Sequence, residues 1–130
     1  MEVRVRNIAV SDAAAWRALR CELWPDGTDD HAAEIASFFA GTLEEPNAVL
    51  MAESADGTIV GFAELSIRED VTGLEGKRTG YVEGLYVCPE FRWQGIARTL
   101  LYASRNWARE MKCIAFASDR AERVVVDRTF

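Results

Sequence analysis

The stretch that decides the fold is LYVCPEFRWQGIA, residues Leu85–Ala97. It begins as an apolar strand, which Pro89 ends, and it continues through a basic, glycine-containing turn into a helix. The first backbone N–H groups of a helix have no partner within it, and they lie at the positive end of the helix dipole. The R-x-x-G-x-A turn of Arg92–Ala97 is therefore suited to a pyrophosphate, which Gly95 would allow to approach the backbone closely.

Two other phosphate-binding turns do not fit this stretch. A P-loop would carry Gly-Lys-Ser/Thr, and a dinucleotide-binding fold would carry G-x-G-x-x-G; neither pattern is present. R-x-x-G-x-A also occurs by chance at ordinary strand-to-helix turns. Its context favours an anion site, because an apolar strand precedes it and an amphipathic helix with Ile96, Leu100 and Trp107 on one side follows.

Hydrophobic periodicity predicts the rest of the fold outward from this turn. Alternating apolar residues predict strands, and a spacing of three or four residues predicts helices. The result is an α/β fold with a mixed central sheet and the order β-α-α-β-β-β-α-β, in which an antiparallel meander leads into a β-α-β unit. The predicted strands are 3–8, 49–53, 59–67, 80–87 and 113–118, with 124–126 as a candidate last one, and the predicted helices are 11–24, 30–43 and 95–111.

Length and composition limit the possible functions. A chain of 130 residues predicts a single domain over residues 1–130. Hydrophobic residues at 49% and charged residues at 28% are typical of a globular protein. With 15 basic and 21 acidic residues the net charge is −6, which disfavours nucleic-acid and membrane partners and suits a cationic one.

The cysteines and the single histidine indicate neither a metal site nor a triad. Cys21, Cys88 and Cys113 are odd in number and follow no metal-binding spacing, so we expect free thiols, no metal and a cytoplasmic protein. His31 lies in the acidic segment Asp29-Asp30-His31. That setting favours a solvated loop residue over a catalytic one.

The turn and several separate segments resemble a known family. R-x-x-G-x-A resembles the acetyl-CoA pyrophosphate signature of the GNAT N-acetyltransferase superfamily, usually written Q/R-x-x-G-x-G/A, and the resemblance spans residues 3–119. Within that superfamily, further segments look like the aminoglycoside 6'-N-acetyltransferases and occur in the same order. They are Leu23-Trp24-Pro25, Gly61-Phe62-Ala63-Glu64 with Ser66–Asp70, Val82–Val87, and Ala117-Ser118-Asp119.

The resemblance implies acetyl-CoA as cosubstrate and direct acetyl transfer to an amine. The thioester would lie where strand 80–87 splays from strand 113–118, and the Leu85 amide would stabilise charge on its carbonyl oxygen. Tyr86 and Val87 would pair with the pantetheine arm like an added strand. Because no acyl-enzyme is needed, the cysteines would be core residues. The pyrophosphate would lie on the turn residues Arg92, Trp93, Gln94, Gly95, Ile96, Ala97 and Arg98.

The same resemblance implies a small polycationic substrate and an acidic pocket for it. An ammonium group must lose a proton before it attacks, and a carboxylate is a suitable acceptor. Glu83 on the splayed strand and Asp119 at the end of its neighbour match acidic pocket positions of the family, as catalytic and substrate-binding residues. Asp70 matches a further acidic pocket position, and Trp24 matches an aromatic residue that packs on the sugar rings.

The resemblance fails after Asp119. Members of the family continue with a helix and one or two strands, whereas eleven residues, 120–130, remain here. The C-terminal part is therefore predicted to be truncated or divergent, to lack the usual last helix, and to leave apolar surface beside strand 113–118 uncovered. A homodimer in which segment 124–126 adds to a partner's sheet would cover that surface.

Three functions remain open from the sequence. The first is transfer of an acetyl group from acetyl-CoA to the 6'-amine of aminoglycoside antibiotics, which confers resistance. The second is GNAT acetylation of another small amine, such as a polyamine, or of a peptide. The third is an inactive protein that binds CoA or an aminoglycoside. The shortened C-terminus favours the third function, and the acidic residues and the turn favour the first.

Overall fold

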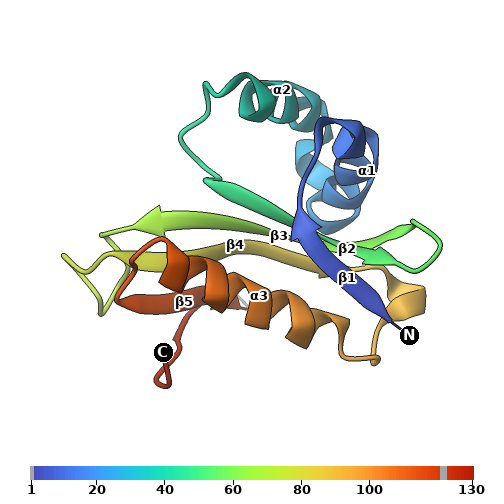
Figure 1. Ribbon diagram of the computed structural model, residues 1–130. Coiled ribbons are helices and arrows are strands. Elements are labelled where there is room, and N and C mark those ends of the chain that lie inside the picture. The colour runs from blue at the N-terminus through green and yellow to red at the C-terminus, as the bar shows by residue number, and fades with distance from the viewer. Residues whose placement is uncertain (1, 121–122) are drawn as a thin grey trace.

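The computed structural model describes residues 2–120 and 123–130, except for the side chains of residues 27–29. Its elements follow the predicted order (Figure 1). The candidate last strand is also present. The strands are β1 (Val3–Asn7), β2 (Ala48–Ser54), β3 (Ile59–Arg68), β4 (Thr79–Val87), β5 (Ala115–Arg120) and β6 (Arg123–Val126), and the helices are α1 (Ala13–Leu23), α2 (Thr28–Ala40) and α3 (Ile96–Glu110).

The strands form one six-stranded sheet in the order β1-β2-β3-β4-β5-β6. All neighbours are antiparallel except β4 and β5, which are parallel and are joined by α3. Figure 1 shows α1 and α2 on one face of the sheet and α3 on the other. This arrangement confirms the mixed α/β sheet expected from the sequence, because parallel neighbours require a crossover of this length.

Each face of the sheet has its own apolar core. On the α3 face, Ile96 and Leu100 pack against strand residues that include Val60 and Leu65. On the α1 face, Trp16 packs on Phe62 and on other large side chains of the strands and of α2. Both faces are therefore buried, as the long apolar runs of the central strands require.

Close approach of α3 to the sheet depends on small residues. A Cβ added at Gly80 would lie 2.5 Å from the Cβ of Ala108, so β4 and α3 touch where neither carries a large side chain. One turn earlier in α3, the buried Ser104 hydroxyl donates to the Leu100 carbonyl oxygen at 2.7 Å. The inner face of α3 thus combines small and large residues in an interlocking pattern.

The parallel strands β4 and β5 separate part-way along their length. Their pairing runs from Thr79↔Ala115 to Val82↔Ser118 and then stops, although β4 continues to Val87. On its other side β4 carries a register shift against β3, so that Glu83 has no partner residue there. Such a bulge bends a strand, and it lies at the point where β4 leaves β5.

The C-terminal segment contradicts the expectation of an uncovered apolar surface. Segment 124–126 lies in β6 and pairs with the chain's own β5. On one face, the Phe130 ring stacks on Phe116 at a centroid separation of 5.8 Å. On the other face, Val126 packs against a cluster that includes the buried Ala117. The expectation was wrong because residues after the strand fold back and cover it, with Arg105 Nε and Asp127 Oδ2 joined at 2.5 Å.

Two further predictions can be compared with the structure. The second helix covers Thr28–Ala40, somewhat before the predicted 30–43. In the described part of the chain, none of the helices has the length and apolar character that crossing a membrane requires.

Candidate active site

The turn before α3 presents backbone donors. Gly95 caps the helix with a φ of 81°, and Trp93 also has a left-handed φ of 68°. The Thr99 N–H donates to the Gly95 carbonyl oxygen at 3.0 Å, which leaves the N–H groups of residues 96–98 without helical acceptors. Such donors at the positive end of a helix form an anion site.

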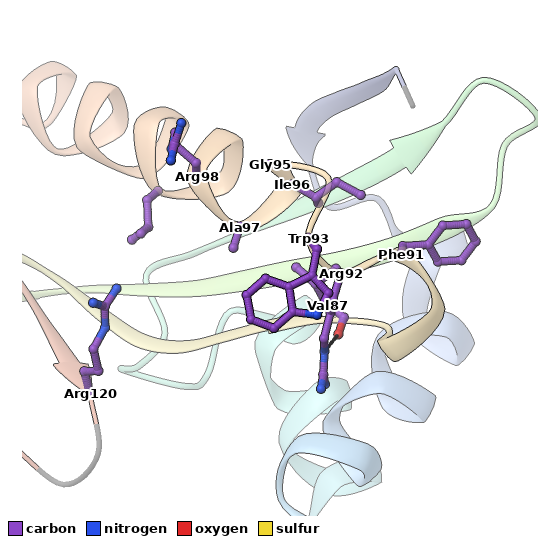
Figure 2. A pocket seen from close by; sticks show the side chains of 10 residues that line it. Val87, Phe91, Arg92, Trp93, Gly95, Ile96, Ala97, Arg98 and Arg120 are labelled. Carbon is purple, nitrogen blue, oxygen red and sulfur yellow. Dashed lines mark hydrogen bonds between the residues drawn. The ribbon is translucent and has the colours of Figure 1, made fainter.

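These donors adjoin a groove of about 560 Å³, which we call the turn groove (Figure 2). Three arginines, Arg92, Arg98 and Arg120, border it, although the net charge of the chain is −6. Arg92 is held in place because its Nε donates to the Val87 carbonyl oxygen at 2.8 Å. The groove is therefore suited to a multiply charged anion. Its lining residues are Val87, Phe91, Arg92, Trp93, Gly95, Ile96, Ala97, Arg98, Leu101 and Arg120.

The turn groove contains all the turn residues that the sequence indicated except Gln94. Three further residues that were not predicted, Phe91, Leu101 and Arg120, also line it. Arg120 belongs to β5 because this strand extends two residues beyond the predicted end at Ser118. Alternation along the strand then places Arg120 on the same face as Phe116, beneath α3. Trp93 is fully exposed at the rim.

Beyond the departure of β5, β4 has an open edge. The Cys88 N–H donates to the Val60 carbonyl oxygen of β3 at 2.9 Å, and backbone groups alternate in direction along a strand. The backbone of Tyr86 therefore faces β3, whereas the N–H groups of Leu85 and Val87 face the open edge. Val87 therefore offers a backbone donor to a pantetheine arm, as expected, and Leu85 offers one to the thioester carbonyl. The expectation that Tyr86 also pairs with the arm was wrong, because its backbone faces β3 and only its side chain lines this edge.

A second groove follows this open edge, and we call it the strand groove. Its volume is about 340 Å³. It shares Val87, Arg92 and Ala97 with the turn groove, so the two are continuous along β4. A long ligand with its anionic group at the turn can extend to Leu85. The strand groove is lined by Glu22, Leu23, Leu85, Tyr86, Val87, Arg92 and Ala97.

An acidic pocket of about 340 Å³ lies at the end of α1, next to the bulge in β4. It brings together Trp24 and Glu83, two of the predicted substrate residues. The Trp24 ring lies over Gly84, where an added Cβ would be 2.6 Å from it, so glycine is required there. The pocket is lined by four glutamates and one arginine among its eight residues, Arg20, Trp24, His31, Glu34, Glu45, Pro46, Glu64 and Glu83.

Glu83 combines partial burial with one cationic neighbour. Burial raises the pKa of its carboxyl group, and the Arg68 guanidinium opposes that rise. Arg68 Nε donates to Glu83 Oε1 at 2.6 Å. A carboxylate with a raised pKa beside a cleft is a candidate proton acceptor.

Asp119, the other predicted catalytic carboxylate, lies on the neighbouring strand. It follows Ser118, the last residue of β5 that pairs with β4, and it is exposed. Alternation places it on the same sheet face as Ala117, which is opposite Tyr81 of β4. Burial raises the pKa of Tyr81, and the negative charges of Asp119 and Glu83 add to that effect. The charges of both carboxylates therefore reach Tyr81 at this end of the sheet. Asp119 nevertheless does not line the acidic pocket.

Arg68 is a site residue that the sequence did not indicate. Besides Glu83, it contacts Glu45 at 3.1 Å and lies 3.9 Å from Asp70. Its guanidinium carbon also lies 5.2 Å from the centre of the Tyr81 ring. Asp70, predicted as a pocket residue, is largely exposed and is linked to Glu83 only through Arg68. The predicted strand 59–67 ended just before Arg68, and its pattern gave no signal for this role.

The expectation that His31 is a solvated loop residue was wrong. His31 lies in α2 and is 4% exposed. It belongs to a buried group with Arg20 of α1 and Glu64 of β3. Burial alone would lower the pKa of Arg20, but Glu64 and Glu34 raise it overall. Nothing in the acidic neighbourhood of His31 in the sequence indicates this partner, because Arg20 is contributed by another helix.

Cys88 and Cys113 do not have the properties of nucleophiles. Burial raises the pKa of both Cys88 and Cys113, which disfavours their thiolate forms. Over residues 2–120 and 123–130, no group of histidine, cysteine and acidic side chains has the geometry to hold a metal ion.

The sequence of the chain matches a known enzyme family. Residues 13–125 match the sequence pattern of the acetyltransferase (GNAT) family. The chain belongs to this family. An aminoglycoside N(6')-acetyltransferase type 1 of Klebsiella aerogenes is 46% identical over 116 residues, which are 88% of this chain and 76% of that protein. A protein of the same name from Stenotrophomonas maltophilia is 42% identical over 88% of this chain and 73% of its own length.

Solved structures of GNAT enzymes have the same fold as this chain. AAC(6')-Iy in complex with the bisubstrate analogue CoA-S-monomethyl-acetylneamine superposes with a TM-score of 0.81 at 32% identity, over 93% of this chain and 81% of that one. The aminoglycoside 6'-N-acetyltransferase AAC(6')-Ih from Acinetobacter baumannii gives a TM-score of 0.80 at 33% identity, over 92% and 80%. The GNAT fold expected from the turn is therefore confirmed.

The anion site at the turn generates a prediction about Gly95. Gly95→Asp would place a carboxylate where the phosphates are expected, and we expect it to weaken CoA binding at least about tenfold, or roughly 1.4 kcal/mol. Gly95→Asn is the matched control, because asparagine tolerates the same left-handed backbone without a charge. Isothermal titration with CoA measures both. Equal CoA affinities for the Asp and Asn variants would contradict an anion site at this turn.

Proposed function

We propose that the chain transfers the acetyl group of acetyl-CoA to the 6'-amine of aminoglycoside antibiotics and thereby confers resistance. The observation that carries this proposal is the continuity of the site along β4. An anion-binding turn, an open strand edge and an acidic pocket follow one another over residues 83–98. Three of the four glutamates that line the pocket, Glu34, Glu45 and Glu83, expose part of their side chains to a polycation, whereas Glu64 is buried against Arg20. The relatives that share this fold are themselves named aminoglycoside acetyltransferases.

The chain's residues fit acetyl-CoA at the first two of these places. The N–H groups of residues 96–98 and the flanking Arg92 and Arg98 would hold its pyrophosphate. The N–H groups at the open edge of β4 would pair with the amides of its pantetheine arm. Its thioester is the activated acyl group that the reaction consumes.

The acetyl transfer then follows from the residues at the bulge. Glu83 would accept a proton from the substrate ammonium, and the free amine would attack the thioester carbonyl carbon. The Leu85 N–H would donate to the carbonyl oxygen as negative charge develops on it. The C–N bond forms, the C–S bond breaks, and the CoA sulfur takes up the second proton that the amine loses. No group on the chain is acylated in this sequence.

A thiol-release assay tests the proposed function against its alternatives. We expect acetyl-CoA to yield free CoA thiol with kanamycin and with tobramycin, because the carboxylates of the acidic pocket can bind several ammonium groups. Release with spermidine alone would instead assign another amine as substrate. No release with any of them, together with measurable CoA binding, would indicate a binding protein without transferase activity.

The carboxylates generate a second prediction. A base must be deprotonated to act, so kcat/KM should fall as the pH is lowered through the pKa of Glu83. Because burial raises that pKa, we expect the fall to lie at a higher pH than the ordinary glutamate pKa of about 4.3. Glu83→Gln should lower kcat about 100-fold or more and remove this acid limb. Asp119→Asn is the matched comparison. We expect it to raise KM for the aminoglycoside, to leave CoA binding intact and to keep the limb.

Steady-state kinetics of the parent and both variants from about pH 4 to pH 9 measure whether the acid limb is lost. This range extends well above the ordinary pKa of a carboxylate. An acid limb that persists in Glu83→Gln would show that another group accepts the proton. Unchanged kinetics in Asp119→Asn would show that its match to the family is incidental.

We also propose the remaining features of the protein from the same observations. Residues 1–130 would form one acetyltransferase domain. The three free cysteines support a cytoplasmic location, since disulfides form in oxidising compartments. A homodimer would form along the outer edge of β6, because β5 occupies only one of its two edges and an exposed strand edge pairs readily with another strand.

The homodimer can be tested with one substitution in β6. Val124 is 37% exposed, and a lysine on an edge strand disfavours edge-to-edge pairing. We expect the parent to sediment as a dimer and Val124→Lys to sediment as a monomer with an unchanged circular dichroism spectrum. Deletion of residues 123–130 is a poorer test, because it also removes Phe130 from α3 and β5. A monomeric parent at micromolar concentration would contradict the proposal.

A further inference from the structure

A buried group of charged and aromatic residues supports the wall of the acidic pocket. Arg20, His31 and Glu64 are 6%, 4% and 2% exposed. Glu64 Oε2 accepts from Arg20 Nε at 2.7 Å and from Trp16 Nε1 at 3.0 Å. On the other side of the guanidinium, Arg20 Nη1 donates to Glu34 Oε2 at 2.5 Å. Arg20 is therefore held from two directions.

The contacts of His31 determine which of its nitrogens carries hydrogen. Its Nδ1 lies 3.3 Å from Arg20 Nη1, and a guanidinium nitrogen can only donate. Nδ1 must therefore accept. Nε2 then carries the hydrogen and donates to the Trp24 carbonyl oxygen at 2.9 Å. In this arrangement His31 is neutral and both of its ring nitrogens are used.

Trp24 depends on the same residues for its position. Its N–H donates to the Arg20 carbonyl oxygen at 2.7 Å, and the guanidinium carbon of Arg20 lies 5.2 Å from its ring centre. Its indole lies over Gly84, next to Glu83. His31 of α2 thus donates to the carbonyl of Trp24, the residue after α1. This hydrogen bond connects α2 to the end of α1, where Trp24 lines the acidic pocket.

We propose that His31 is a positioning residue for the amine pocket and that its protonation releases Trp24. The substrate part of this inference rests on the proposed function, whereas the coupling of His31 to Trp24 does not. A proton on Nδ1 would replace the acceptor with a donor and would place two positive groups 3.3 Å apart. Arg20 cannot easily withdraw, because Glu64 and Glu34 hold it. The histidine and the Trp24 carbonyl would therefore separate.

Five other charged residues line the same pocket as His31. They are Arg20 from α1, Glu34 from its own helix, Glu45 from the segment before β2, Glu64 from β3 and Glu83 from β4. Arg20 Nη1 faces Nδ1 at 3.3 Å, so a positive charge on that nitrogen is unfavourable in the present arrangement. Because the contact with Arg20 excludes that charge at Nδ1, the ring must turn when it is protonated.

Two substitutions separate the bonding of His31 from its titration. In His31→Gln the amide oxygen and nitrogen are spaced much like the two ring nitrogens, so the side chain can accept from Arg20 and donate to the Trp24 carbonyl, but it cannot titrate. In His31→Phe the planar bulk remains and both hydrogen bonds are lost. Thermal unfolding of each variant shows that it is folded before it is compared.

The first measurement needs no enzymatic activity. The four tryptophans are labelled as 5-fluorotryptophan, and Trp24→Phe assigns the Trp24 signal in the ¹⁹F NMR spectrum. We expect the Trp24 signal to shift on acidification in the parent and to stay in place in His31→Gln. The same pH dependence in His31→Gln and the parent would overturn the proposal.

The second measurement connects this coupling to the substrate. We expect His31→Phe to raise KM for kanamycin about tenfold at every pH, with kcat and KM for acetyl-CoA nearly unchanged. His31→Gln should restore the parental KM at neutral pH and should lack the rise in KM that the parent shows on acidification. Because substrate protonation is common to all three proteins, their difference isolates His31.

The two measurements also separate the two proposals. If the parent acetylates no amine, the proposed function fails, and the NMR titration still decides whether His31 controls Trp24. If the parent is active but both His31 variants share its KM at every pH, the positioning role is wrong while the function stands.

Discussion

The separation of β4 from β5 is the constraint on which the rest of the site depends. Two parallel strands that stayed paired would use every backbone group between them, and no ligand could reach that edge. Here pairing with β5 ends at Val82↔Ser118. At the same place Glu83 has no pairing residue in β3, and this bulge bends β4. The separation exposes the Leu85 N–H. It also puts Glu83 and Asp119 at the ends of the paired region.

The sequence predicted those parts of the site that follow from local pattern. The turn at Gly95 and its anion-binding donors are properties of one strand–turn–helix segment, and the resemblance led to Glu83 and Trp24. What the sequence did not predict depends on distant partners. His31 looks exposed among acidic neighbours, but it is buried because an arginine of another helix meets it. Phe130 lies in the segment that diverges from the family, and only its stacking on Phe116 shows that this segment contributes to the core.

Buried charge beside the substrate pocket has a cost and a use. Arg20 and Glu64 are 6% and 2% exposed, so their mutual attraction must offset most of the loss of hydration, and an apolar pair would often be as stable. Removal of one partner from such a pair typically costs about 3–5 kcal/mol. The pair instead supplies rigidity. Two tryptophans lie within 5.5 Å of the same guanidinium, so one charge fixes the aromatic surfaces on both sides of it.

The parallel pairing of β4 with β5 also has a consequence for folding. The antiparallel strands β1 to β4 include hairpins between consecutive strands, whose contacts are close in sequence and form early. The pairing of β4 with β5 requires α3 to cross the sheet first, and closing that longer loop costs more chain entropy. By this measure we expect the β2–β3 and β3–β4 pairs to form before the catalytic edge, whereas β1 must close a still longer loop to reach β2. The site that binds acetyl-CoA would thus form only after these two hairpins.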